Sequence, residues 1–146
     1  MLSILVGEDD FSIHEKLEEI KRSIGETSVL PANMSVLEGQ ALTLDDLRKV
    51  AEVVPFLAEK RLVIVQGLLA RFGEKSKPGR NKTKTSDRQS VHQPFADYLL
   101  NVPQSTIVVL VDILDKKAID KNPLLNELSA HAQVLTFPLL KDARLR

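Results

Sequence analysis

An acidic triplet, Glu8, Asp9 and Asp10, follows a short apolar run at the start of the chain. In an α/β fold, chemistry gathers at the carboxyl ends of the strands, so these acids are candidate Mg²⁺ ligands, although three carboxylates would repel a phosphate. Nucleotide binding would need the pattern G-x-x-x-x-G-K-[ST], whose backbone amides and lysine hold the phosphates. The stretch VGEDDFS lacks that pattern, and Gln66 stands where a third strand would offer an acidic magnesium ligand. We therefore expect no ATPase activity.

The same acids allow an alternative, a receiver-like phosphoacceptor domain of the response-regulator class. The stretch ILVGEDDFSIHEKLEEI resembles the opening of such a domain, where paired acids bind magnesium beside a phosphoacceptor aspartate. A receiver needs that aspartate after its third strand, Ser or Thr after its fourth and Lys-Pro after its fifth. This chain offers Gln66, Asp112 and 136–138 (TFP) instead. The acids are better explained as helix-capping residues, with Asp10 as the expected N-cap.

Other catalytic chemistry finds no support in the composition. The chain has no cysteine, which excludes thiolate nucleophiles, disulfides and cysteine zinc sites. Its three histidines, His14, His92 and His131, are scattered without metal-ligand spacing. We expect no catalytic residue, no metal and no cofactor. The formal net charge is zero, so bulk electrostatics favour neither nucleic acid nor a membrane. Because no signal peptide or membrane span is evident, we expect a cytoplasmic protein.

Short apolar runs alternate with helical patterns along the chain. Since the third and fourth runs are apolar throughout, we expect strands covered on both faces of a sheet. The pattern predicts the α/β class, with a five-stranded, mainly parallel sheet flanked by helices. The strands are expected at residues 1–6, 34–39, 61–67, 105–113 and 132–138, and the helices at 11–24, 42–54, 93–101 and 122–132.

Residues 71–91 have a different composition, rich in Gly, Ser, Lys and Arg and without an apolar period. Such a segment is typical of a flexible, solvated insertion. Its basic residues also allow an arm that touches phosphate, although no aromatic side chains interleave for base stacking. The basic residues concerned are Lys75, Lys77, Arg80, Lys82, Lys84 and Arg88.

Taken in order, several stretches resemble the N-terminal domain of the delta subunit of bacterial DNA polymerase III, a part of the clamp loader. The resemblance implies an AAA+-like (P-loop NTPase-like) domain without a functional phosphate loop and without intrinsic catalysis, although the family belongs to a DNA-directed DNA polymerase holoenzyme. It implies a clamp-binding domain at 1–140, and at 141–146 the start of a linker to a lid domain. The stretches are LVGEDDFSIHEKLEEIK, LEGQALTLDDLRKVAEVVPFLAEKRLVIVQGLL, FADYLLNVPQSTIVVLVD and LTFPLLKDARL.

The family also gives a role to Phe56 and Leu57, an apolar pair that follows Pro55. Delta subunits press such a pair into a hydrophobic pocket of the sliding clamp, the beta subunit, and so open the ring during DNA replication. The residues alone leave an alternative, in which the pair packs into the domain's own core. Other implied partners are the delta prime and gamma/tau subunits, with DNA bound only in the assembled loader. We expect Pro55 to end the preceding helix and to stiffen this joint, and the flanking residues Glu59, Lys60 and Arg61 to form a polar rim of the clamp-binding site.

Overall fold

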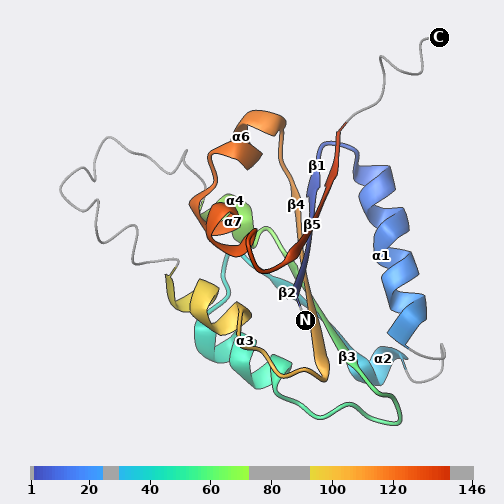
Figure 1. The fold of residues 1–146 in the computed structure, drawn as a ribbon. Helices are drawn as coiled ribbons and strands as arrows, with labels where there is room; N and C mark the ends of the chain where they lie inside the picture. Colours follow the sequence, from blue (N-terminus) through green and yellow to red (C-terminus); the bar gives the residue numbers. More distant parts are fainter. Residues whose placement is uncertain (1, 25–29, 73–92, 139–146) are drawn as a thin grey trace.

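The computed structural model describes residues 2–24, 30–72 and 93–138, and these form a layered α/β domain (Figure 1). Its sheet has five strands in the order β2-β3-β4-β1-β5, and every strand pair in these ranges is parallel. The predicted five-stranded parallel sheet is therefore confirmed. The strands are β1 (Leu2–Gly7), β2 (Met34–Glu38), β3 (Arg61–Gln66), β4 (Thr106–Ile113) and β5 (Gln133–Phe137).

Helices cover both faces of the sheet, but unequally. The long helix α1 (Asp10–Ile24) lies on one face, and a second group of helices lies on the other (Figure 1). The short helix α2 (Leu30–Asn33) leads directly into β2. The second group contains α3 (Leu44–Ala51), α4 (Leu68–Arg71), a helix at 93–99, α6 (Lys116–Asp120) and α7 (Pro123–Leu128).

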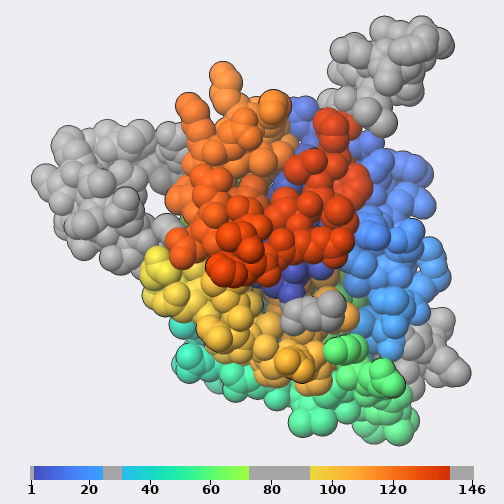
Figure 2. All heavy atoms as spheres, in the orientation of Figure 1, coloured from blue at the N-terminus to red at the C-terminus, as the bar shows by residue number. Residues whose placement is uncertain are grey.

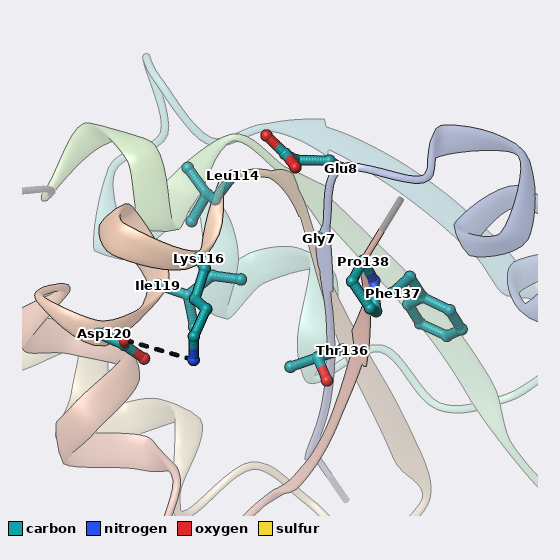
Figure 3. A pocket seen from close by; sticks show the side chains of 9 residues that line it. All are labelled: Gly7, Glu8, Leu114, Lys116, Ile119, Asp120, Thr136, Phe137 and Pro138. Carbon is teal, nitrogen blue, oxygen red and sulfur yellow. Dashed lines mark ion pairs between the residues drawn. The ribbon is translucent and has the colours of Figure 1, made fainter. Parts of the chain in front are cut away.

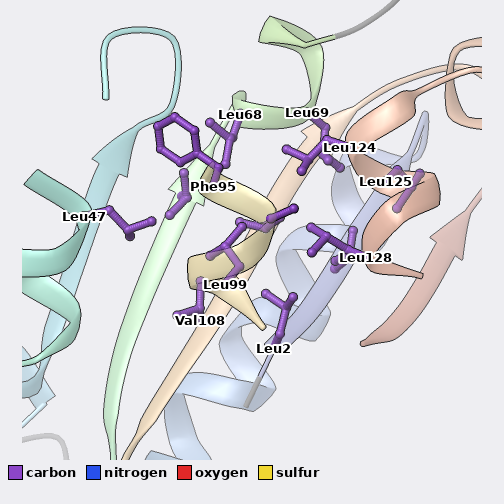
Figure 4. Close-up of a cluster of buried hydrophobic side chains, with 14 of the residues drawn as sticks. Leu2, Leu47, Leu68, Leu69, Phe95, Leu99, Val108, Leu124, Leu125 and Leu128 are labelled. Carbon is purple, nitrogen blue, oxygen red and sulfur yellow. The ribbon is translucent and has the colours of Figure 1, made fainter. Parts of the chain in front are cut away.

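The core consists of two apolar clusters, one on each side of the sheet. Along β4, Val108 and Leu110 face the larger cluster beneath the second group of helices, and Val109 faces the cluster beneath α1. All three side chains are fully buried, which explains why the middle of the strand is apolar on both faces. Figure 4 shows the larger cluster, where leucines of α4 and α7 meet Phe95 and Leu99 of the helix at 93–99.

The ends of several helices differ from the prediction. Helix α1 is capped by Asp9 rather than Asp10, since one Asp9 carboxylate oxygen accepts from the Ser12 amide at 3.1 Å and the other from the Ser12 hydroxyl at 2.8 Å. Helix α3 ends at Ala51, not at residue 54, so the chain turns before Pro55 is reached. Helices α2, α4 and α6 were not predicted because four or five residues carry no helical period.

The basic insertion predicted at 71–91 is described only at its start. Arg71 ends α4, and its guanidinium donates to the carbonyl oxygens of Gly39 and Leu42 at 3.0 and 2.7 Å. It also lies over the rings of Phe72 and Phe95. Arg71 therefore belongs to the folded domain. The six basic residues from Lys75 to Arg88 lie outside the described residues, as does the linker predicted at 141–146.

Candidate functional site

Exposed apolar side chains gather in the turn between α3 and β3. Of the seven large hydrophobic side chains that are exposed among the described residues, four lie within 53–57. Val54 is 79% exposed, Leu57 75% and Phe56 57%. Scattered exposed hydrophobics are ordinary, but a contiguous group marks an interaction surface. We call Phe56 and Leu57 the knob. The alternative that these two side chains fill the domain's own core is wrong.

The knob lies at the amino end of the sheet, where the parallel strands begin. Figure 2 shows the segment between α3 and β3, in green, at the lower edge of this face of the molecule. Helix α3 carries the chain into this turn, and Thr43 caps the helix by accepting from the Asp46 amide at 3.0 Å. Because α3 ends at Ala51, the residues that follow leave the helix and turn outward, with Val53 45% exposed.

A buried carboxamide holds the backbone of the knob. Asn33, which is fully buried, donates through Nδ2 to the Phe56 carbonyl oxygen at 2.7 Å. Its Oδ1 accepts from the Phe56 amide at 2.6 Å. The next residue, Leu57, has a φ of 56°, the left-handed conformation that non-glycine residues rarely adopt. The backbone is therefore fixed while both side chains point to solvent.

Arg61 has a different role from the predicted polar rim. It is only 7% exposed, and its guanidinium donates to the Val50 carbonyl at 2.9 Å, the Ala32 carbonyl at 3.1 Å and the Ser35 hydroxyl at 2.8 Å. A planar guanidinium suits this arrangement because its donors diverge in a fixed geometry. Arg61 thus joins α2, β2 and α3 beneath the knob and is not free to contact a partner.

The other residues predicted beside the knob remain on or near the surface. Glu59 is exposed, and Pro55 is half-buried. Lys60 is half-buried too, and its ammonium donates to the Gln104 carbonyl at 2.9 Å. Glu59 is therefore the charged member of the predicted rim with the most open position.

Helix α3 is braced by Tyr98 of the helix at 93–99. The Tyr98 hydroxyl donates to a Glu52 carboxylate oxygen at 2.8 Å, and the Arg48 guanidinium lies 5.4 Å from the centre of the Tyr98 ring. Burial, followed by the bond to the Glu52 carboxylate, raises the pKa of Tyr98 to about 12. A shallow hollow of about 300 Å³ lies on this side of α3, lined by Asp45, Arg48, Lys49, Glu52 and Val53.

The carboxyl end of the sheet, where a phosphate loop would lie, is closed by backbone hydrogen bonds. The amides of Glu8 and Asp9 both donate to the Phe137 carbonyl oxygen, at 3.0 and 2.9 Å. Gly7 has a φ of 147°, and a Cβ there would lie 2.3 Å from the same oxygen. The amides that would cradle a phosphate therefore already bond to β5.

Asp112, at the end of β4, is buried and serves a neighbouring helix. Its carboxylate accepts from the amides of Leu69 and Ala70 at 3.0 and 3.1 Å, which caps the start of α4. Burial raises the pKa of Asp112 to about 6, against the opposing effect of those two amides. Among the residues that the structure describes, no group of three His, Cys, Asp or Glu side chains could hold a metal ion.

One cavity of about 230 Å³ opens at this carboxyl end, between β1, β5 and α6 (Figure 3). It is smaller than the pockets that usually bind drug-sized ligands. Its single basic side chain, Lys116, makes an ion pair with Asp120 at 3.9 Å, and Glu8 adds another negative charge. Such a lining does not suit a nucleotide phosphate.

No helix in the described ranges has the length and apolar character needed to cross a membrane.

Comparison with known proteins gives a consistent result. A family model described as DNA polymerase III, delta subunit, matches residues 4–138. The structure resembles the Bacillus subtilis DNA clamp loader delta protein with a TM-score of 0.68 and 24% identity, over 94% of this chain and 38% of that one. It also resembles a DNA polymerase III gamma subunit-related protein from Thermotoga maritima, with a TM-score of 0.51 and 20% identity, over 98% of this chain and 43% of that one. A search of curated proteins returned no match. The predicted AAA+-like fold is confirmed.

Proposed function

The chain belongs to the DNA polymerase III delta-subunit family, and from this we propose that it acts in clamp loading by docking its knob into an apolar pocket of the sliding clamp. The observation that carries the proposal is the exposure of Phe56 and Leu57 on a backbone held by a buried residue. Phe and Leu side chains that stand in water have much to gain from a hydrophobic pocket.

The expected strength of this contact follows from area and rigidity. Burial of each side chain on the clamp contributes roughly 1.5–3 kcal/mol. A segment whose backbone is already fixed loses little conformational entropy on docking, so more of that gain appears as affinity. Two such anchors are enough to dominate an interface whose surrounding contacts are nearly neutral. Glu59 and the exposed charges of α3 would lie at its rim.

The proposed action is mechanical rather than catalytic. A protein shifts an equilibrium only by its difference in affinity for the two states, so the domain opens the ring by binding an open or strained clamp more tightly than a closed one. The closed backbone turn at Gly7–Asp9 is consistent with ATP being used by neighbouring subunits, not by this chain. Those neighbours are the delta prime and gamma/tau subunits of the loader.

The chain matches 38% of the length of the Bacillus subtilis protein. The domain assignments and the contacts of the whole delta subunit are therefore part of the proposal. We assign residues 1–140 to clamp binding and residues 141–146 to the start of a linker that leads to a lid domain. DNA contact belongs to the assembled loader.

The experiment is a binding measurement with the cognate sliding clamp, by calorimetry or surface plasmon resonance. The variant Phe56→Ala/Leu57→Ala removes the knob, and we expect affinity to fall by roughly 100-fold or more, as two lost anchors imply. Because both side chains are exposed, the thermal unfolding midpoint should stay close to that of the wild type.

A matched control removes an equally exposed apolar pair at the opposite end of the sheet. Phe11 is 71% exposed and Ile113 is 53% exposed. The variant Phe11→Ala/Ile113→Ala should bind the clamp as the wild type does. Equal affinity of the knob variant and the wild type would refute the assignment of the knob.

A further inference from the structure

We propose that Asn33 is a positioning residue for clamp binding: its carboxamide fixes the geometry of the knob before the clamp arrives. This inference rests on the proposed function and adds a residue to it. Asn33 is fully buried at the end of α2, so it does not meet a partner itself. It acts through the backbone of Phe56.

The two hydrogen bonds of Asn33 form a closed pair. One amide group both donates to the Phe56 carbonyl at 2.7 Å and accepts from the Phe56 amide at 2.6 Å. Two residues that face each other on antiparallel β-strands can exchange the same pair of N–H···O=C bonds, and here a side-chain amide takes the place of one of them. Both backbone polar groups of Phe56 are satisfied on the protein side, so its side chain is left on the solvent side, 57% exposed.

The conformation that follows needs such a restraint. Leu57 adopts a φ of 56°. This left-handed conformation is unfavourable for a non-glycine residue because its Cβ lies close to the following carbonyl oxygen. A turn without an anchor would relax from this state. Because Phe56 is fixed on both of its polar groups, Leu57 is held in the orientation that exposes its side chain.

Asn33 is itself fixed from beneath by Arg61. The Arg61 guanidinium donates to Ala32 on one side of Asn33 and to Ser35 on the other, at 3.1 and 2.8 Å. Its Nε donates to Val50 near the end of α3, at 2.9 Å. The anchor of the knob is therefore tied to the two elements that flank it, and the geometry is set within the domain rather than by the partner.

The consequence is a cost that the wild type does not meet on binding. If the restraint is removed, the knob samples other conformations in solution and must be ordered by the clamp. When the backbone of one residue must be ordered on binding, the association constant falls roughly five- to thirtyfold. We expect Asn33→Ala to reduce clamp affinity by about this factor although it removes no contact with the clamp.

A second buried asparagine provides a matched control. Asn122 is 1% exposed, donates to the Leu69 carbonyl at 2.7 Å and accepts from the Leu125 amide at 3.0 Å. Like Asn33, it donates one bond to a carbonyl and accepts one from an amide, but its partners are two different residues, one in α4 and one in α7, away from the knob. Asn122→Ala should lower the thermal midpoint as Asn33→Ala does, since each leaves buried polar groups unpaired, and should leave clamp affinity unchanged.

Amide hydrogen exchange tests the restraint without the clamp. In the wild-type chain the Phe56 amide should be protected although it lies in an exposed turn. In Asn33→Ala its exchange should accelerate about tenfold or more, as the loss of a hydrogen bond implies, and in Asn122→Ala it should not change. Asn33→Ser replaces the carboxamide by one hydroxyl, which can make at most part of the bonding to Phe56, so it should give an intermediate effect. It also serves as the second variant if Asn33→Ala does not fold.

The outcomes separate this inference from the function on which it rests. Wild-type clamp affinity in Asn33→Ala, with a loss in Phe56→Ala/Leu57→Ala, would keep the knob and refute the role of Asn33. Unchanged Phe56 exchange in Asn33→Ala would refute that role whatever the clamp does. A loss of affinity in Asn122→Ala equal to that in Asn33→Ala would show a general effect of stability and would refute it too. If the knob variant itself binds normally, the proposed function fails first.

Discussion

The two ends of the sheet use their polar groups in opposite ways. At the carboxyl end, the amides of Glu8 and Asp9 bond to Phe137 and the Asp112 carboxylate bonds to α4, so polar groups that could meet a ligand are used within the fold. At the amino end, Asn33 and Arg61 are buried, and the side chains directed to solvent above them are apolar. The first end is closed by its own hydrogen bonds. The second presents an apolar surface on a backbone that buried side chains hold.

This contrast shows how the proposed binding surface obtains its rigidity. The exposed residues of the knob make few contacts of their own, yet their backbone conformation is specified by side chains that a partner never touches. Buried polar groups cost free energy unless they are fully bonded, so their presence beneath an exposed apolar turn indicates a conformation that must be unique. A core of the same size filled with leucine would hold the turn less specifically.

We expect the largest change in stability when the polar support of the amino end is removed. Arg61→Leu removes the buried guanidinium and leaves the partly buried bonds to the carbonyls of Val50 and Ala32 without their donor. We expect a loss of about 3 kcal/mol in the free energy of unfolding, measured by urea denaturation, since removal of a buried charged donor carries a penalty of this order. Arg61→Lys should recover only part of this loss because an ammonium cannot reproduce three divergent bonds. Full stability of Arg61→Leu would contradict the role given to the guanidinium.

A smaller effect tests the carboxyl end through pH. The folded-state pKa of Asp112 is raised from 3.8 to about 6, so the protein holds this proton more tightly when folded. Its contribution to stability is therefore fully present below about pH 4 and is lost as pH rises through about 6. Compared with Asp112→Asn, the wild type should lose about 2–3 kcal/mol between these limits, the value of a shift of this size.

The measurement is urea unfolding of the wild type and Asp112→Asn at several pH values across that range. The difference between the two free energies of unfolding cancels the contribution of the other carboxylates, because these titrate in both proteins. A difference that stays constant with pH would show that Asp112 titrates normally, and the carboxyl end would then be less tightly closed than the structure indicates.

The sequence predicted the architecture better than the details of the site. Runs such as 62–65 and 107–111 are apolar throughout, and burial on both faces of a parallel sheet is the reason, so the fold could be predicted from local pattern. The end of α3 could not, because Val53 and Val54 continue the apolar pattern of the helix although they lie outside it, exposed. Apolar periodicity cannot distinguish a last helical turn from the start of a binding surface.

The support of the knob was missed for a different reason. Asn33 is separated from Phe56 by 23 positions, and no residue pattern near either one signals their contact. Arg61 was assigned to the polar rim because it adjoins exposed charges in sequence, but its partners come from α2, β2 and α3. The exposure of the knob was expected only through the family resemblance, since Phe and Leu next to a buried strand are as often core residues.

A substitution at Gly7 gives the smallest of these effects and separates the two ends most cleanly. A Cβ at this position would lie 2.3 Å from the Phe137 carbonyl oxygen, and the φ of 147° suits glycine alone. Gly7→Ala must therefore loosen the turn that joins β1 to β5, at a cost of about 2 kcal/mol in the free energy of unfolding. Because the strain arises at the carboxyl end, clamp affinity and Phe56 amide exchange should both remain at wild-type values in the folded protein. A change in either would mean that the two ends of the sheet are coupled through β1 and β4, and the amino end would no longer be an independent unit.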